Sequence, residues 1–110
     1  MKELYHRLFE ELPCYVSVQD RDLRLIAVNS MFRRDFGGKP GAYCYQIYKG
    51  RAGKCADCPV KQTFRDGKSH ASEEIVTRKD GEDVNVIVYT SPVRNPNGKI
   101  DAVVETRRHY

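Results

Sequence analysis

Several features that would assign the protein to a particular class are missing from its sequence. The chain has no tryptophan, no internal repeat and no apolar run near the roughly 20 residues that span a bilayer. Its N-terminus, MKELYHRLFEELP, is charged throughout, whereas a signal peptide needs an apolar centre. No serine–histidine–aspartate order, phosphate-binding loop or metalloprotease helix is found. We therefore expect a cytoplasmic domain that does not insert into a membrane and is not itself an enzyme.

A contiguous basic stripe is also missing. The net charge is only +4, and acidic residues interrupt the arginines and lysines between Glu73 and Asp83. A protein that binds nucleic acid normally gathers its positive charge on one face or helix. We expect no nucleic-acid partner.

The composition that remains is that of an ordinary globular domain. The chain has 110 residues, of which 40% are hydrophobic and 31% charged. This length buries one hydrophobic core of moderate size. We divide it into an amphipathic helix at 1–12 and one domain at 13–110.

The first third of the chain has clear signals for secondary structure. Leucines at every fourth position predict an apolar stripe on a helix over residues 2–11, which Pro13 ends. Alternating, β-branched residues predict strands in CYVSVQD and RLIAVN. Asn29 and Ser30 are typical helix caps and precede a short helix, MFRRDF.

The rest of the chain predicts helices followed by a meander. AYCYQIY favours a helical turn or two, and a helix begins at Pro59 and ends at Gly67. Strands are expected at 70–78, 83–91 and 99–107, joined by the turn sequences KDGE and NPNG. This order predicts an α+β fold in which helices cover one face of a single antiparallel sheet.

The strand VNVIVYT has apolar residues on both faces. Alternate residues of a strand point to opposite sides, so Val84, Val86 and Val88 oppose Asn85, Ile87 and Tyr89. Helices cover only one face, and the other needs the N-terminal helix or a second copy of the domain. We therefore predict a homodimer with the contact residues Leu4, Leu8, Ile87 and Tyr89.

The order of elements and several segments resemble the PAS domain family. The segments are CYVSVQDRDLRLIAVN for the opening hairpin, the turn at Asp80-Gly81 and YTSPVRNPNGKIDAVV for the last two strands. The resemblance implies a PAS fold, with a five-stranded sheet and short helices around a small cavity. It also implies a sensory module of a larger signalling protein, which we expect to be a two-component histidine kinase whose effector domain lies outside this sequence.

Two cofactors that members of this family bind are not expected in this chain. Flavin-binding members carry a reactive cysteine after the hairpin, and this chain has none at the comparable place. A haem-binding member would offer a histidine from the middle helices, but no histidine falls in residues 29–67. We expect neither flavin nor haem, and the cofactor, if any, stays unknown.

Three of the four cysteines form a C-x10-C-x2-C pattern at Cys44, Cys55 and Cys58. They are candidates for a metal site, with a fourth ligand from Cys14, Asp57 or His70, or for a reversible disulfide. Cys58 precedes the Pro59 helix, whose dipole favours a thiolate. Simple packing of small apolar side chains is the third interpretation.

Aromatic and branched residues supply a candidate ligand pocket. Its predicted lining is Phe36, Tyr45, Tyr48, Phe64, Val86, Val88 and Val104. We expect the domain to sense a small ligand or redox state and to mediate dimerisation. The alternatives are a ligand-free structural dimerisation module and a metal or redox sensor built on the cysteines.

Overall fold

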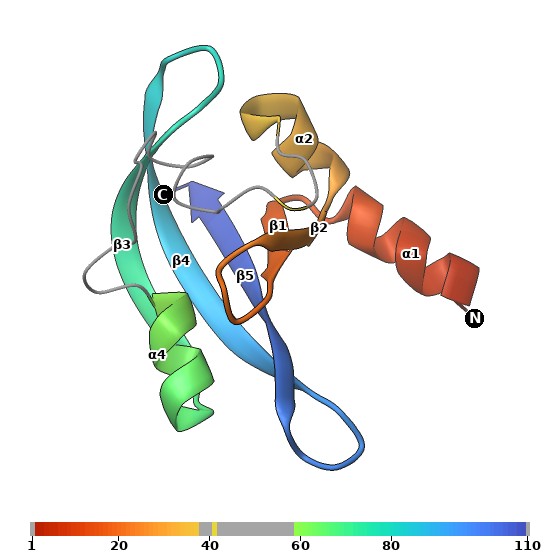
Figure 1. Ribbon diagram of the computed structural model, residues 1–110. Coiled ribbons are helices and arrows are strands. Elements are labelled where there is room, and N and C mark those ends of the chain that lie inside the picture. Colours follow the sequence, from red (N-terminus) through yellow and green to blue (C-terminus); the bar gives the residue numbers. More distant parts are fainter. Residues whose placement is uncertain (1, 38–40, 42–58, 110) are drawn as a thin grey trace.

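The computed structural model describes residues 2–37, 41 and 59–109, which form a curved sheet with helices packed on it (Figure 1). The helices are α1 (Lys2–Glu11), α2 (Ser30–Phe36) and α4 (Pro59–Asp66). The strands are β1 (Tyr15–Gln19), β2 (Leu25–Val28), β3 (His70–Thr77), β4 (Asp83–Arg94) and β5 (Ile100–His109). The strand order is β2-β1-β5-β4-β3, and every neighbouring pair is antiparallel. The predicted α+β fold with one five-stranded antiparallel sheet is confirmed.

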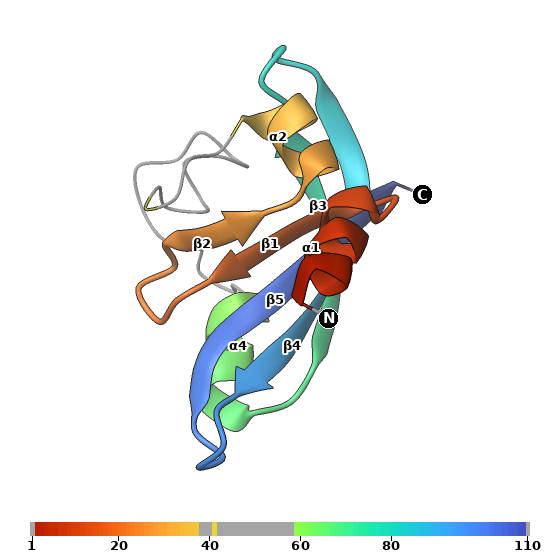
Figure 2. The same ribbon diagram turned by 90° about the vertical axis from the view of Figure 1, so that its right-hand side faces the viewer.

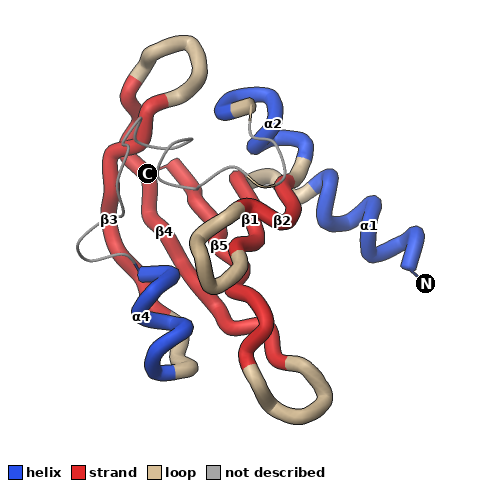
Figure 3. Tube along the Cα trace, viewed as in Figure 1, coloured by secondary structure: helices blue, strands red, loops and turns tan. Residues whose placement is uncertain are grey.

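The last two strands are longer than the sequence predicted. Their pairing continues as far as Arg94 and Ile100, next to the turn that joins them. In that turn the Asn95 side chain accepts hydrogen bonds from the backbone N–H groups of Asn97 and Lys99. Gly98 adopts φ 84°, a conformation that a glycine reaches at no steric cost. This turn and the one between β3 and β4 lie at opposite ends of the sheet (Figure 3).

Asn29 fixes the junction of three elements. Its Oδ1 accepts hydrogen bonds from the backbone N–H of Phe32, which caps α2, and from that of Val16 in β1. Its Nδ2 donates to the carbonyl of Cys14 at 2.9 Å. The side chain is completely buried, and so the predicted helix cap also ties the segment between α1 and β1 to the core.

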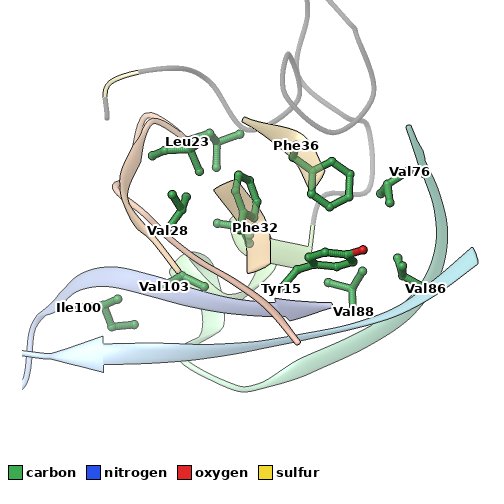
Figure 4. Packing of buried hydrophobic residues seen from close by; sticks show 12 residues of the cluster. Tyr15, Leu23, Val28, Phe32, Phe36, Val76, Val86, Val88, Ile100 and Val103 are labelled. Carbon is green, nitrogen blue, oxygen red and sulfur yellow. The ribbon is translucent and has the colours of Figure 1, made fainter. Parts of the chain in front are cut away.

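Helices α2 and α4 lie on the same face of the sheet, towards its two ends (Figures 1 and 2). Phe32 and Phe36 of α2 and Val60 of α4 pack into one apolar cluster with the sheet. The other members are Tyr15, Leu23, Leu25, Val28, Val76, Val86, Val88, Ile100 and Val103. Figure 4 shows these side chains filling the space between α2 and the strands. Burial of this cluster is the main apolar contribution to the stability of the fold.

The position of α1 corrects one expectation. We considered this helix as a cover for the second face of the sheet, but it extends away beside β1 and β2 and packs against α2 (Figure 1). The Glu10 carboxylate binds Arg33 and accepts a hydrogen bond from Ser30. These polar contacts hold α1 at the side of the domain and leave its leucines exposed. Among the described residues, no helix is long and apolar enough to cross a membrane.

Candidate functional site

The register of the strands defines two faces of the sheet. Val86 and Val88 of β4 point towards the helices and are completely buried. Because paired residues of antiparallel strands share a face, Arg107, which pairs with Val88, lies on that side too. We call this helix-covered side the inner face and the opposite side the outer face.

Four polar side chains lie buried at the centre of the inner face. They are Ser17 and Gln19 of β1 and Glu105 and Arg107 of β5, and none is more than 4% exposed. Ser17 pairs directly with Glu105 across the two strands. We refer to these four residues as the polar array.

Hydrogen bonds connect the members of the polar array. The Gln19 Nε2 group donates to Ser17 Oγ at 2.8 Å and to Glu105 Oε1 at 2.9 Å. Arg107 Nη1 donates to the same Glu105 oxygen at 2.5 Å. Glu105 is thus held on one oxygen by an amide and a guanidinium.

A second carboxylate lies beside the array. Glu74 of β3 has its Oε1 3.9 Å from Arg107 Nη2, and its Oε2 accepts a hydrogen bond from Ser72. A fully buried ion pair repays its desolvation cost only when geometry and hydrogen bonding are favourable, and apolar replacements are often no less stable. The array therefore places polar and charged groups in an interior where apolar side chains could also be buried.

A different polar contact lies at the end of the inner face near α2. The Tyr15 hydroxyl donates to Asp35 Oδ2 at 2.5 Å, and its ring packs edge-on against Phe36 with the ring centres 4.8 Å apart. Burial, reinforced by this bond to a carboxylate, raises the pKa of Tyr15 to about 12. The bond from Arg34 holds the pKa of Asp35 below its usual value, with Tyr15 adding to the effect. The Tyr15 hydroxyl therefore stays protonated and donates a hydrogen bond to Asp35 across the physiological pH range.

The structure brings together only part of the predicted pocket lining. Phe36, Val86 and Val88 belong to the inner-face cluster. Phe64 packs against this cluster, with the Arg21 guanidinium 5.0 Å above its ring. Tyr45 and Tyr48 lie outside the described residues.

The assignment of Val104 to this pocket was wrong. Val104 pairs with Ser91 and Val18, which alternate with inner-face residues along β4 and β1. Its side chain therefore points to the outer face, and Val103 occupies the core position that it was expected to fill. A shift of one residue in a strand reverses the face, and the pairing of β4 with β5 shifts its register between Val93 and Arg94, beside the NPNG turn.

The residues predicted to form a dimer contact come from α1 and β4. Leu4 and Leu8 are exposed on α1, whereas Tyr89 is exposed and Ile87 is half-buried on the outer face of β4. An open groove runs between α1 and β2, with Tyr5, Phe9 and Ala27 in its wall. Both α1 and the outer face of the sheet thus present exposed apolar side chains.

Most of the residues predicted to bind a metal or to form a disulfide lie outside the described residues. They are Cys44, Cys55, Asp57 and Cys58. Cys14 is a free thiol, and partial burial raises its pKa. His70 Nε2 lies in hydrogen-bond contact with Asp66 Oδ2, at 2.8 Å, beside the end of α4. Within residues 2–37, 41 and 59–109, no three metal-binding side chains come together.

The polar array was missed by the sequence analysis. In YVSVQ the valines alternate with Ser17 and Gln19, a pattern that normally places the polar residues in solvent. Here the polar positions face the helices, and Val16 and Val18 face outward. The signal that could have revealed it is the repetition of the pattern in β5, where Glu105 and Arg107 also alternate with less polar residues.

Comparison with known proteins agrees with this architecture. A family model described as the PAS fold matches residues 9–109. None of the curated proteins matches the chain.

Similar solved structures cover essentially the whole chain. VqmA bound to DPO has a TM-score of 0.81 and 21% identity, and the match covers 100% of this chain and 58% of VqmA. The PAS domain of an HTR-like protein from Haloarcula marismortui has a TM-score of 0.78 and 19% identity, covering 99% of this chain and 91% of that one. An RNA-binding light-oxygen-voltage receptor has a TM-score of 0.82 and 18% identity, over 99% of this chain and 32% of the receptor.

Identities this low support the fold alone, and the chain spans little more than half the length of VqmA. The family model, by contrast, covers nearly all of the sequence. The resemblance noted in the opening hairpin and the final meander is therefore confirmed, and the chain belongs to the PAS fold family.

Proposed function

We propose that this domain is a sensor that holds a small ligand between the inner face of the sheet and its helices. In this proposal the domain is part of a larger signalling protein, with a two-component histidine kinase as the expected parent. It acts by ligand-dependent regulation of a dimer and catalyses no reaction itself.

The observation that carries the proposal is the polar array. If this face had only a structural role, we would expect apolar side chains on it, because they can be buried without the desolvation cost of polar groups. Instead Gln19, Glu105 and Arg107 are buried there with a hydrogen-bond network. Ligand sites in proteins combine mainly apolar walls with a few precisely held polar groups, and the inner face has this composition.

The route of the signal is suggested by Asn29. This residue binds the backbone of β1, α2 and the segment that leads back to α1. A ligand that displaces α2 relative to the sheet would alter these bonds and with them the direction in which α1 leaves the domain. In this way occupancy of the inner face would reach the surface that a partner contacts.

The test of ligand binding starts from purified chain. We expect mass spectrometry of the denatured protein to release a small molecule, or a metabolite collection that includes DPO to contain a compound that raises the Tm. A ligand that binds only the folded state stabilises it. Once the ligand concentration is well above the Kd, this stabilisation grows with the logarithm of that concentration. An outer-face variant, Ile75→Ser, is the matched control and should bind the compound equally well.

The absence of any ligand would support the alternative function. If nothing is released and no compound changes the Tm of either protein, the domain is a ligand-free dimerisation module. The inner-face polar array would then have only a structural role.

The dimer part of the proposal has its own experiment. Leu4 and Leu8 present an exposed apolar stripe on α1, and covering such a stripe favours association. We expect sedimentation velocity to show a concentration-dependent dimer, which Leu8→Asp weakens and Glu3→Gln on the same helix does not. A strict monomer at every concentration would contradict dimerisation through α1.

A further inference from the structure

A small pocket lies where the turn between β1 and β2 comes beside α4 (Figures 1 and 2). Its volume is about 210 Å³, and it is lined by Arg21 of the turn and by Lys61, Phe64 and Arg65 of α4. No member of the polar array belongs to this lining. The pocket, which we call the α4 pocket, is therefore separate from the ligand site proposed on the inner face.

Two contacts hold Arg21 at the α4 pocket. Its Nη2 donates a hydrogen bond to the carbonyl of Ile100 at 3.2 Å. Its guanidinium lies 5.0 Å from the centre of the Phe64 ring, in a cation–π contact that joins the turn to α4. Its remaining N–H groups meet no acceptor in residues 2–37, 41 and 59–109. Arg21 thus offers a guanidinium that the fold positions before any ligand arrives.

Lys61 and Arg65 bring two more positive charges to the same pocket. They are four residues apart on α4, and side chains at this spacing are neighbours on the surface of a helix. Like charges at this spacing destabilise a helix. Both side chains are exposed, and neither has an ion pair or hydrogen bond within the part of the chain that the structure describes. An anion bound between them and Arg21 would relieve their repulsion.

The α4 pocket differs in this respect from other arginines of the domain. Arg34 binds Asp35, and Arg78 binds Asp80 and Glu82. Among the described residues, no carboxylate lines the α4 pocket. Its cations therefore keep their hydrogen-bond donors for a group that comes from outside the domain.

Carboxylates that are close to these cations in the sequence make other contacts. Asp20 accepts hydrogen bonds from the backbone N–H groups of Asp22 and Arg24. Asp66 lies 2.8 Å from His70 Nε2. Neither carboxylate binds a cation of the α4 pocket, and so the pocket is not closed by an internal ion pair.

We infer that Arg21, Lys61 and Arg65 form a binding site for a small phosphate monoester. Guanidinium and ammonium groups both bind phosphate oxygens through charge-assisted hydrogen bonds. Three cations attract a group with two negative charges more strongly than a group with one, which favours a monoester over a phosphodiester or a carboxylate. This site is additional to the proposed sensor function and does not depend on it.

A bound phosphate would connect parts of the chain that are distant in sequence. It would link the β1–β2 turn to α4, and Arg21 also contacts the start of β5 through the carbonyl of Ile100. Because the unfolded chain does not bring these cations together, the ligand binds the folded state and stabilises it. Binding should therefore be visible in both elements at once.

The experiment compares three salts at equal ionic strength. Glycerol phosphate is a dianion at about pH 7.5, dimethyl phosphate is a monoanion, and chloride is the control for screening. The ¹⁵N-labelled chain is titrated to roughly 20 mM of each, which nearly saturates a site of millimolar affinity. We expect glycerol phosphate to give saturable shifts in the backbone amide signals of Arg21, Lys61 and Arg65. Dimethyl phosphate should bind at least about fivefold more weakly, and chloride should give no saturable shift.

Variants that remove one charge each locate the site. Lys61→Gln should weaken the binding of glycerol phosphate roughly fivefold, the upper range for an exposed ion pair. Lys79→Gln is the matched control, because it removes the same charge from the exposed β3–β4 turn, and it should change the affinity by less than about twofold. Arg21→Lys keeps the charge but not the planar fork, and should weaken binding less than Arg21→Gln does.

The same measurements can overturn the inference. Equal shifts with chloride would mean an ionic-strength effect only, and equal affinities for the two phosphates would contradict the monoester class. An unchanged affinity in Lys61→Gln would contradict the site itself. Lys61 and Lys79 are both exposed, so these two variants should fold and their comparison stays decisive. The sensor proposal is decided separately, by the release of a ligand from the purified chain.

Discussion

The inner face of the sheet buries polar side chains, whereas the outer face leaves large apolar side chains in solvent. Gln19 and Glu105 are at most 1% exposed beneath the helices. On the other side Ile75 is 61% exposed and Tyr89 47%. A domain that had only to fold would distribute these residues the other way round, with polar groups outside.

We propose that this inversion reflects tasks beyond folding on both faces. In this proposal the buried polar groups offer specific hydrogen bonds to a ligand, and the exposed apolar groups offer a surface for a partner. The sheet between them is one hydrogen-bonded layer, in which β5 carries the buried Glu105 and its neighbour β4 carries the exposed Tyr89. The following predictions test how far the two faces really differ.

The largest effect is expected from breaking the inner-face ion pair on one side only. Glu105→Ala leaves the Arg107 guanidinium buried without its closest carboxylate. Removing one partner of a buried pair costs about 3 to 5 kcal/mol. The free energy of unfolding in urea measures this loss, and a loss below 1 kcal/mol would mean that the pair is effectively solvated.

Replacing both partners of the ion pair should not lower the free energy of unfolding. Glu105→Leu combined with Arg107→Met fills the same space without charge, and such exchanges are neutral or stabilise by about 1 to 4 kcal/mol. We expect the double variant to be at least as stable as the wild type but to lose ligand binding. A double variant as unstable as Glu105→Ala would show that the array is needed for folding.

A moderate effect is expected at Asn29, where β1, α2 and the segment that follows α1 meet. Asn29→Ala removes the cap of α2 and leaves the N–H of Val16 without its acceptor. The expected loss is about 2 kcal/mol. Hydrogen exchange should also accelerate in the segment between α1 and β1, and unchanged exchange there would contradict the role of Asn29 in holding α1.

The pH dependence of stability should report the Tyr15 contact. The pKa of Tyr15 is raised to about 12 in the folded protein, above the ordinary value near 10. Stability from this group is therefore complete below about pH 10 and is lost as the pH rises through about 12, by no more than about 3 kcal/mol. Urea unfolding of wild type and Tyr15→Phe should converge over this range, and parallel curves would contradict the assignment.

The smallest effect on folding is expected on the outer face. Ile75→Thr changes an exposed side chain and should alter the free energy of unfolding by less than about 0.5 kcal/mol at low protein concentration. If a partner covers this face, the same variant should weaken association. A large loss of monomer stability would show that the outer face is part of the core.

Element types and order were predictable from the sequence because their signals are local. Asn29 before α2, Pro59 at the start of α4 and the glycines of the turns act through neighbouring backbone. The direction in which each strand faces was harder to predict, because apolar residues occupy both faces of the sheet. Val104 was placed on the wrong side, and the polar array escaped notice because it joins β1 to β5, whose paired residues Ser17 and Glu105 lie 88 positions apart.

The turn between β1 and β2 has a consequence for the order in which the domain folds. Leu23 adopts φ 66°, a left-handed conformation that is unfavourable for a branched residue, and its side chain is buried in the core. Hydrogen bonds to the Asp20 side chain support that turn locally, as those to Asn95 support the turn at Gly98, but only Leu23 has a steric cost there, which its burial in the core offsets. β1 must also find β5 across 88 positions, from Ser17 to Glu105, and such distant pairing forms slowly. We expect the β3–β4–β5 meander to form first, and the two strands that complete the polar array to meet in the last stage of folding.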